Sequence, residues 1–442
     1  MSRRTCGAFE ALARTAFGAV VRTFSAPVVM TAPEGVALTL SVPVVLTVAG
    51  AFALTLSAPV AQAQPAASGL REMVANGTTS LRVRYRLEHV DQADFDEQAL
   101  ASTALGRWTW NSARSDAWSF GLEADYVFVA GIEDFNSTTN GKTQFPIIAD
   151  LDGGDLNQAF LKYAGEGVTV TAGRQRINLG AQRFVGGAAF RQNEQTYDAL
   201  RVQLSRGDAM LDYSYVNNIN RIFGPGDGLQ PGDWYGDTHL LRGSLRPAPD
   251  QEFVAFAYLF DLGNDNGPPN SNASYGISYR GEFDFATVDV ILSRQSEWAE
   301  NPVTYDAPLY TFRSDFPLGG ETVLTLGFEL LGSDDGRRAV RTPSATMHGR
   351  QGWTDKFLIA PPDGVRDAWF SVAGNLGHAR LIGVYHDFSA HEGGRSYGSE
   401  IGFDVTYTLP NRVGLEFKFA KYDADGHDTD TTKVWFMVGY AL

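Results

Sequence analysis

The sequence predicts an all-β fold, namely a transmembrane antiparallel β-barrel of about 18 strands that follows a cleaved N-terminal signal peptide. Apolar and polar residues alternate from about residue 80 to the last residue, Leu442, as in strands whose two faces meet different surroundings. Short and long connections alternate between these segments. Mean hydropathy is only −0.17, which argues against a bundle of transmembrane helices but suits a barrel, whose apolar band is hidden in the alternation.

The first 63 residues have the features of a signal or targeting segment. Arginines precede an uncharged apolar stretch over residues 36–60, and an A-x-A cleavage pattern follows at residues 61–63. We therefore expect the mature chain to begin at Gln64 and to reach the barrel through a short periplasmic lead-in, residues 64–79. The alternative, an uncleaved helical anchor, is disfavoured by Pro43 within the apolar stretch and by the cleavage pattern at its end.

Cysteine content and charge exclude several classes of function. The single cysteine, Cys6, lies in the segment that we expect to be removed. The mature chain would then have no disulfide, no cysteine nucleophile and no cysteine ligand for a metal. The formal net charge of −15 argues against nucleic-acid binding, which needs a basic surface.

Strand patterning begins at residues 81–89, LRVRYRLEH, where apolar residues alternate with three arginines and a glutamate. In residues 118–128, aromatic and apolar side chains share one face, while Glu123 and Asp125 lie on the other. The same alternation returns at residues 413–420 and in the final segment, residues 433–442. Each of these segments is therefore predicted to be a strand with one apolar and one polar face.

The connections between strands fall into two alternating classes. Eight short turns are expected at residues 111–116, 164–167, 205–208, 247–251, 281–283, 317–321, 376–378 and 409–412. Nine long loops are expected at residues 91–98, 130–155, 178–196, 219–237, 262–272, 296–304, 334–364, 389–397 and 423–432. Together they separate about 18 strands, and an even strand number with turns at one end and loops at the other is typical of bacterial outer-membrane barrels. A soluble β-sandwich or a propeller would not explain this alternation.

The three arginines of the first strand are predicted to face the lumen. The opposite phase would place Arg82, Arg84 and Arg86 in hydrocarbon, at about 2–4 kcal/mol each near the bilayer midplane. The same argument directs other arginines inward, which are Arg107, Arg201, Arg242, Arg246 and Arg280. It also directs acids inward, which are Glu88, Glu123, Asp125, Asp212, Asp289, Glu329, Asp404 and Glu416.

Arginines in a water-filled lumen indicate an anionic solute. A guanidinium group binds a carboxylate in a two-pronged geometry and stays charged at any relevant pH. Charged side chains line ion pores in this way, and passage requires many weak contacts rather than one tight site. The competing interpretation is structural, because the inward acids can pair with the arginines across the wall.

Several stretches resemble the alginate export family of outer-membrane β-barrels, and the resemblance runs from about residue 80 to the C-terminus. The stretches are NSTTNGKTQFP (136–146), LNQAFLKYAG (156–165), GRQRINLGAQRFVGG (173–187), RQNEQTYDAL (191–200), NRIFG (220–224), GDWYGDTHLL (232–241) and YHDFSA (385–390). The resemblance implies an 18-stranded barrel with an arginine-rich pore for a polyuronate. One departure is the C-terminal residue, which is Leu442 where such barrels commonly end in Phe or Trp.

The GRQR motif and the loop after it are candidate pore elements. The resemblance places Arg174 and Arg176 in the pore, although both share a phase with Val170 and Ala172 unless a bulge near Gly173 intervenes. Without a bulge, these arginines would sit above the apolar band. The following loop, residues 178–196, carries Arg183 and Arg191 and is expected to fold into the lumen as a constriction.

Two further motifs carry alternative predictions. A G-x-S-x-G pattern spans residues 394–398, but a nucleophile elbow needs a strand-turn-helix context that is missing here. An outer-membrane hydrolase would have to use His386, Asp387 and either Ser389 or Ser396. Loop-bound calcium is the other alternative, and its acidic ligands would be Asp423, Asp425, Asp428 and Asp430.

The sequence therefore predicts a channel in the bacterial outer membrane, not an enzyme, that passes an anionic polysaccharide, alginate or a similar polyuronate, by diffusion. The alternative is a general porin for small anionic solutes or oligouronates. Neither function requires a cofactor or a catalytic residue. The expected partners are the anionic solute, outer-membrane lipid and lipopolysaccharide, with periplasmic export proteins as a further possibility.

Overall fold

The computed structural model describes residues 30–31, 37–38, 69–264 and 266–442. In the N-terminal unit, β1 (Met30–Thr31) and β2 (Ala37–Leu38) pair as antiparallel strands. The rest of the predicted targeting segment, its cleavage site included, lies outside the described residues. Within the described part of the chain, no helix is long and apolar enough to cross a membrane.

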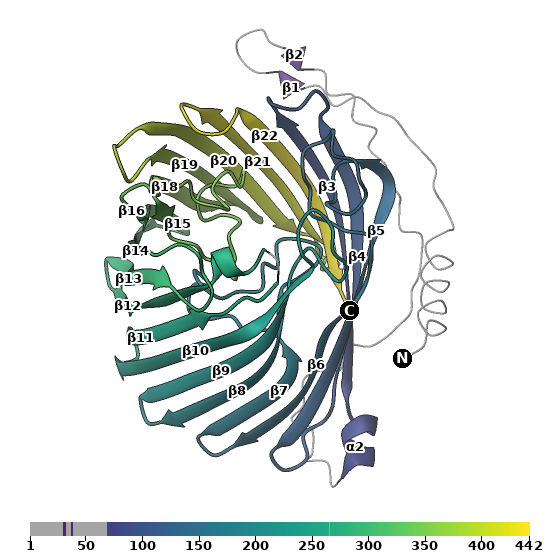
Figure 1. The fold of residues 1–442 in the computed structure, drawn as a ribbon. Helices are drawn as coiled ribbons and strands as arrows, with labels where there is room; N and C mark the ends of the chain where they lie inside the picture. The colour runs from purple at the N-terminus through teal and green to yellow at the C-terminus, as the bar shows by residue number, and fades with distance from the viewer. Residues whose placement is uncertain (1–29, 32–36, 39–68, 265) are drawn as a thin grey trace. The chain divides into compact units, whose positions relative to one another are not determined.

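Eighteen antiparallel strands form one closed barrel, in which β22 pairs with β3 to complete the ring (Figure 1). The short helix α2 (Leu70–Ala75) precedes it, within the predicted lead-in. The strands are β3 (Thr78–Gln92), β4 (Ala99–Asn111), β5 (Trp118–Asp134), β6 (Gly153–Gly165), β7 (Val168–Gln175), β8 (Thr196–Arg206), β9 (Ala209–Asn220), β10 (Asp233–Ala248), β11 (Gln251–Phe260), β12 (Asn272–Phe283), β13 (Ala286–Glu297), β14 (Asp306–Gly319), β15 (Thr322–Leu331), β18 (Val365–Leu376), β19 (Ala379–Ser389), β20 (Ser396–Thr408), β21 (Gly414–Ala424) and β22 (Thr431–Ala441). The prediction of an 18-stranded antiparallel barrel is confirmed.

The predicted alternation of turns and loops is also observed. One end of the barrel carries the short turns, such as Gly207–Asp208 between β8 and β9. The other end carries the loops, and the two longest are residues 176–195 between β7 and β8 and residues 332–364 between β15 and β18. The latter loop contains a small hairpin of β16 (Ser333–Asp334) and β17 (Arg338–Ala339), and η1 (Pro268–Asn270) lies between β11 and β12.

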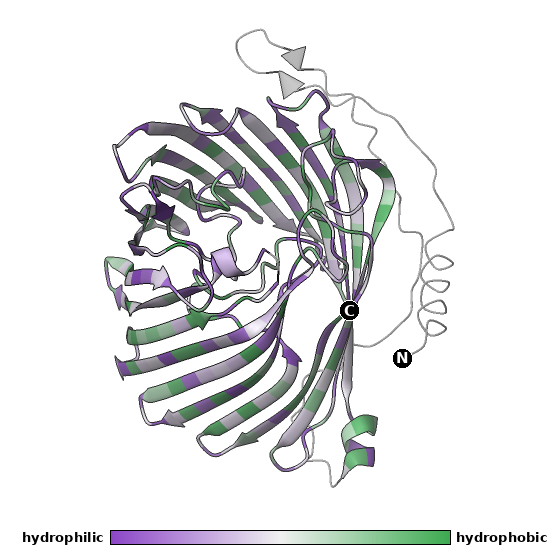
Figure 2. Ribbon diagram, viewed as in Figure 1, coloured by the Kyte–Doolittle hydropathy of each residue, from purple (hydrophilic) through white to green (hydrophobic). Residues whose placement is uncertain are grey.

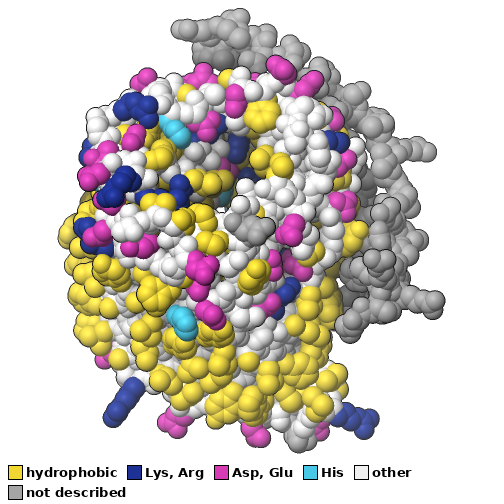
Figure 3. Space-filling view, viewed as in Figure 1, with side chains coloured by type: hydrophobic (Ala, Val, Ile, Leu, Met, Phe, Trp, Pro, Cys, Tyr) yellow, Lys and Arg dark blue, Asp and Glu magenta, His cyan; other side chains and the backbone are white. Residues whose placement is uncertain are grey.

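Outward side chains form an apolar surface. Large hydrophobic residues that alternate with inward polar ones are exposed on the outside, among them Leu122, Leu161, Leu200, Leu241, Ile277, Phe370, Ile401 and Phe436. Figure 2 shows the resulting stripes of hydrophobic and hydrophilic residues along the strands. In Figure 3, hydrophobic side chains cover much of the lower part of the view. A closed barrel with this surface satisfies all its backbone hydrogen bonds internally, as hydrocarbon requires.

One part of the inner wall is apolar, because β11 carries hydrophobic residues on both faces. Its inward Val254, Phe256, Tyr258 and Phe260 are buried. Phe184 of the β7–β8 loop packs on them, with its ring centroid 5.1 Å from that of Phe256. The core of the molecule therefore lies inside the barrel, between this wall and an inserted loop.

Candidate pore and its charged lining

The two long loops meet inside the barrel and form one constriction. Gly186 N donates to Ser344 O at 2.8 Å, and Thr346 N donates to Gln182 O at 3.1 Å. The Gln195 side chain adds a third link, with its Nε2 at 2.9 Å from Ser344 O. These hydrogen bonds join the β7–β8 loop to the β15–β18 loop, so the two loops are expected to move as a unit.

Two of the three arginines on β3 hold this constriction. The Arg84 guanidinium donates to the carbonyl oxygens of Ala189 and Arg191 and, at 2.8 Å, to the Gln192 side chain. Arg86 donates to Phe190 O and lies over the Phe190 ring, with Cζ 4.4 Å from the centroid. Both guanidinium groups thus donate hydrogen bonds to the backbone of the β7–β8 loop.

Arg86 also forms a fully buried ion pair. Its Nη1 lies 3.2 Å from Asp150 Oδ2, and neither side chain has any exposed surface. Asp150 comes from the β5–β6 loop and also accepts hydrogen bonds from Gln192 N at 3.1 Å and from Thr103 Oγ1 at 3.1 Å. The carboxylate thus joins two loops to the β3–β4 wall.

A second buried charge cluster surrounds Asp355 of the β15–β18 loop. Arg191 bridges Glu88 at 3.1 Å and Asp355 at 3.3 Å, and Lys433 of β22 lies 3.2 Å from the same carboxylate. Burial alone would raise the pKa of Asp355, but His348, Lys433 and Arg191 hold that pKa well below its usual value. Asp355 therefore remains ionised and fixes both loops to the wall.

His348 fills the centre of this cluster as a neutral ring. Its Nδ1 lies 2.9 Å from Asp355 Oδ1, and its Nε2 lies 3.3 Å from Lys418 Nζ. The ring stacks on Phe190 with centroids 3.6 Å apart. Burial lowers the pKa of His348 to about 3, although Asp355 opposes this shift. The neutral tautomer donates to Asp355 and accepts from Lys418.

The β15–β18 loop is also anchored to two further strands of the wall, β20 and β15. Glu400 of β20 accepts hydrogen bonds from the backbone of Trp353 and, at 3.0 Å, of Thr354. Glu329 of β15 accepts from Gln351 Nε2 at 2.6 Å and forms an ion pair with Arg183 of the other loop. Arg183, a predicted constriction residue, thus connects the loop to the wall rather than facing open lumen.

Arg107 and Arg176 share a cluster of three acids. Arg107 lies 2.5 Å from Asp125 and 2.7 Å from Glu194, and Arg176 lies 2.6 Å from Glu194 and also pairs with Glu123. Glu194, in the β7–β8 loop, was not among the predicted site residues, because its partners are far from it in sequence. The acids outnumber the arginines here, so the cluster supplies no excess positive charge.

Arg174 is a correction to the predicted pore lining. It pairs in register with Ala159 and Asp198, with no shift near Gly173, and so keeps the outward phase of Leu161 and Leu200. Its Nε lies 2.7 Å from Asp198. The anticipated bulge is absent from this ladder. Arg176, by contrast, follows the last residue of β7 and turns inward, because the chain leaves the ladder there.

Acids alternate with arginines along the wall from β8 to β14. Direct cross-strand partners include Arg242 with Asp212, and Asp289 with both Arg280 and Arg313. The closest ion pairs are 2.5 Å for Arg201 with Asp212 and 2.9 Å for Arg280 with Asp289. In order around the wall, the belt reads Arg201, Asp212, Arg242, Glu252, Arg280, Asp289, Arg313 and Asp315. This belt is neutral as a whole.

Among the inward cations on the strands, Arg84 and Lys418 form hydrogen bonds with the constriction loops. Arg82, Lys162 and Arg380 make no such hydrogen bond and no ion pair within the described part of the chain. Arg82 shares the phase of Arg84 and Arg86, Lys162 alternates with the outward Leu161, and Arg380 shares the phase of His386. All three lie in the strand halves nearer the short turns. Their surroundings are mixed, because the inward acids Asp404 and Glu416 follow on β20 and β21.

The residues proposed for a hydrolase are not brought together. His386 lies inside, with Nδ1 2.9 Å from Asp367 Oδ1, whereas its neighbour Asp387 is exposed on the opposite face of β19. Ser389 pairs with Ser396 at the end of the strand. A nucleophile, a base and an orienting acid do not converge here, as a catalytic triad requires.

The acidic outer loop has partners of its own. Asp428 lies 2.7 Å from Lys356, Asp423 lies 2.6 Å from Lys421, and Asp430 accepts a hydrogen bond from Ala424 N. Among the described residues, no three His, Cys, Asp or Glu side chains are grouped as a metal site.

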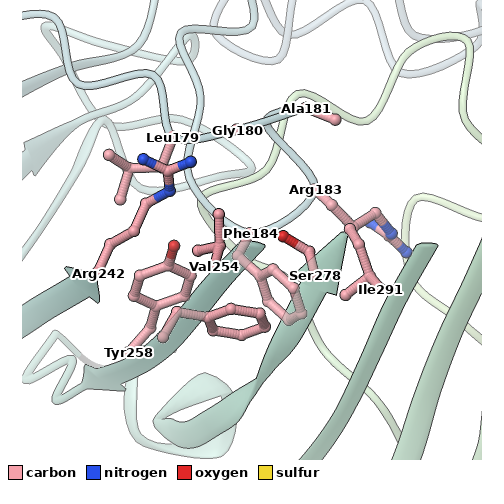
Figure 4. Close-up of a pocket in the computed structure, with 11 residues that line it drawn as sticks. Leu179, Gly180, Ala181, Arg183, Phe184, Arg242, Val254, Tyr258, Ser278 and Ile291 are labelled. Atoms are coloured by element: carbon pink, nitrogen blue, oxygen red, sulfur yellow. The ribbon is translucent and has the colours of Figure 1, made fainter. Parts of the chain in front are cut away.

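A small cavity lies between the β7–β8 loop and the apolar wall, where Phe184, Arg242 and Tyr258 are among the side chains that line it (Figure 4). Its volume is about 40 Å³. Since a single water needs roughly 10–15 Å³ by such a measure, this cavity has room for a few waters and is too small for a sugar-sized solute.

No protein-family model matches this sequence, and no curated protein sequence matches it. Solved structures share its fold. Pseudomonas aeruginosa OccK9 (OpdG) has a TM-score of 0.65 at 13% identity, covering 84% of this chain and 99% of that chain. Pseudomonas aeruginosa OccK3 (OpdO) has a TM-score of 0.63 at 12% identity, covering 85% of this chain and 98% of that chain. Acinetobacter baumannii OccAB4 has a TM-score of 0.60 at 12% identity, covering 83% of this chain and 98% of that chain.

At these identities the likeness establishes the fold alone, and the resemblance to the alginate export family stays a prediction. The architecture itself is informative, because an even-numbered closed antiparallel barrel with an apolar outer surface is the form that proteins take in bacterial outer membranes. The chain is therefore a transmembrane β-barrel of the bacterial outer membrane, as predicted.

Proposed function

We propose that this protein is an outer-membrane channel through which small carboxylate-bearing solutes diffuse, with uronates and short oligouronates among them. One observation carries the proposal. Arg82, Lys162 and Arg380 face the lumen without an ion pair among the described residues, in a chain whose formal net charge is −15. Cations that face a water-filled lumen without an ion-pair partner lower the barrier for an anion.

A small solute fits better than a polymer chain. The two long loops occupy the lumen and are fixed to the wall by buried ion pairs, such as Arg86 with Asp150 and Arg191 with Glu88. Most of the other wall arginines are neutralised by acids. The acids also limit how tightly an anion is held, which favours release over retention. No bond is made or broken in this function.

A polyuronate is the second candidate solute. The stretches GRQR at residues 173–176 and RQNEQTYDAL at residues 191–200 support it, since they resemble the alginate export family. For a polymer to pass, the joined loops would have to move aside. Lipopolysaccharide, outer-membrane lipid and periplasmic export proteins remain the expected partners.

The test is the ion selectivity of single channels in planar bilayers, measured as the reversal potential in a salt gradient. The wild-type protein is expected to prefer chloride over potassium. The triple variant Arg82→Ala/Lys162→Ala/Arg380→Ala is expected to lose at least about half of that preference, because lumenal charge sets the local ion concentration. Maltotriose, which is neutral, and trimannuronate are then compared as blockers, and only the uronate should reduce the wild-type current.

The matched control removes three cations from the outer surface. Arg294, Arg366 and Lys421 are exposed and lie in the outward phase of their strands. Their triple alanine variant changes the net charge equally and should keep the wild-type reversal potential. Equal losses in both variants, or a wild-type channel without anion preference, would disprove the proposed function.

A further inference from the structure

Two arginines of the β15–β18 loop lie beside one another and beside Tyr305, near the loop ends of β13 and β14. Arg338 is part of β17, and its Cζ is 5.9 Å from the centroid of the Tyr305 ring. Arg341 follows one turn of chain later and is close enough to Arg338 for their charges to repel. The two guanidinium groups take no part in the contacts that anchor the loops.

Both guanidinium groups are partly buried without a carboxylate partner among the described residues, and the Tyr305 hydroxyl is a neutral acceptor within reach of Arg338. Nε and Nη2 of Arg338 and Nε and Nη1 of Arg341 are buried and make no hydrogen bond. Neither side chain forms an ion pair with any carboxylate in the described part of the chain. Burial, followed by the charge of Arg338, lowers the pKa of Arg341 to about 10. The two adjacent positive charges therefore lack an anionic partner that would compensate them.

Other buried arginines that lack a carboxylate do not share this feature. Arg84 donates to three oxygens of the β7–β8 loop. Arg221 donates to Pro231 O at 2.7 Å and lies 3.8 Å over the Trp234 ring. Buried donors in folded proteins are nearly always satisfied, so an unsatisfied pair of like charges indicates a missing counter-ion.

The backbone that carries the pair is held in place. Gln295 of β13 accepts from Arg341 N at 2.7 Å and donates to Arg341 O at 2.7 Å. The same side chain accepts from the Tyr305 hydroxyl at 2.8 Å. These three hydrogen bonds hold the loop backbone at Arg341 and the Tyr305 ring against β13. The two guanidinium groups are thus supported by a fixed frame, which reduces the entropy lost when a ligand binds.

We propose that Arg338 and Arg341 form a binding site for a single carboxylate at the loop end of the barrel, where a uronate arrives before it passes the constriction. Two guanidinium groups can bind a carboxylate through parallel N–H···O hydrogen bonds and replace the missing acceptors. The choice of a uronate as ligand rests on the proposed function, whereas the site itself rests on the orphaned donors.

The test is calorimetric titration of the detergent-purified protein, isolated from outer membranes, with D-glucuronate, D-glucose and glucose 6-phosphate. Glucuronate is expected to bind saturably and glucose not at all. The Arg338→Gln/Arg341→Gln variant should bind glucuronate at least about tenfold more weakly, since it loses two charge-assisted contacts. Arg338→Lys/Arg341→Lys, which keeps the charge but not the fork, should fall between. Glucose 6-phosphate binding tighter than glucuronate would reassign the site to phosphate and overturn the carboxylate.

The matched control is Arg337→Gln, because Arg337 is adjacent, 60% exposed and already paired with Asp334 at 2.7 Å. It should bind glucuronate like the wild type. Heat-modifiable electrophoretic mobility reports whether each variant is folded. The inference fails if a folded double variant binds within twofold of the wild type, or if Arg337→Gln loses as much. If glucuronate does not bind at this site but the channel is anion-selective, the proposed function stands and only this inference fails. If glucuronate binds but the channel is not selective, only the proposed function is refuted.

Discussion

Replacing Arg86 by methionine is expected to free the β7–β8 loop and to raise single-channel conductance severalfold. The change removes the partner of Asp150 and the donor to Phe190 O, both at fully buried positions. Breaking a buried pair on one side costs about 3–5 kcal/mol, because the remaining charge is left desolvated. A loop held mainly by such contacts releases rather than keeping an unpaired carboxylate in place.

Two variants make this result specific. Arg86→Met/Asp150→Asn removes both charges while the amide can still bind Thr103 and Gln192, so it should recover much of the wild-type conductance. Arg82→Met alters the same face of β3 four residues nearer the chain start, at an exposed side chain without an ion pair among the described residues. It should change selectivity but not channel size. A double variant as open as Arg86→Met would refute the anchor.

Acidification from pH 7 to pH 4.5 is expected to loosen the constriction through His348. A histidine in the released loop has an ordinary pKa of about 6.5 and takes up a proton below it. In the anchored loop the pKa of His348 is held at about 3, because burial opposes the charge. The anchored state is therefore favoured fully above about pH 6.5 and loses stability as the pH falls toward 3, by about 2 kcal/mol at pH 5.

Other charged groups around His348 do not account for a loss of loop anchoring that begins below about pH 6.5. Asp355 has a pKa below its usual value, so its contribution is complete above about pH 4 and is lost only at more acidic pH. Burial lowers the pKa of Arg191, but Glu88 and Asp355 raise it by more, so Arg191 stays charged throughout this range. A protonated His348 would also direct an N–H at Lys418, only 3.3 Å away.

The measurement is current noise and mean conductance between pH 7 and pH 4.5. Wild-type channels should become noisier and more open as the pH falls. His348→Asn keeps a donor for Asp355 and has no titration in this range, so its conductance should stay flat. An identical response of the variant and the wild type would assign the effect to other groups.

Local pattern predicted the barrel well. Strand number, the order of turns and loops, and the inward phase of Arg82, Arg84 and Arg86 all follow from alternation within single segments. The predicted inward direction of Glu123 and Asp125 is likewise observed in the strand register. These features depend on neighbours in the chain and on the cost of placing charge in lipid, which apply to any barrel.

At a strand end, the phase placed Arg174 correctly but not Arg176. Arg174 and Arg176 share a parity, yet Arg174 stays in the ladder and faces outward, whereas Arg176 lies just beyond β7 and turns inward. Family resemblance had placed both in the pore. Backbone geometry at a strand terminus depends on the loop that follows, and periodicity does not describe it.

The sequence alone determined the architecture: a closed barrel with charged residues inside and hydrophobic residues outside, because each strand has to satisfy the bilayer by itself. Only the tertiary structure decided what the lumenal charges do. Arg86 meets Asp150 from another loop, Arg191 meets Asp355 from a third, and Arg338 and Arg341 meet no acid at all among the described residues. An ion pair requires its two charged groups to lie within a few ångströms of each other. Groups from different segments reach this distance only after the loops have folded into the lumen.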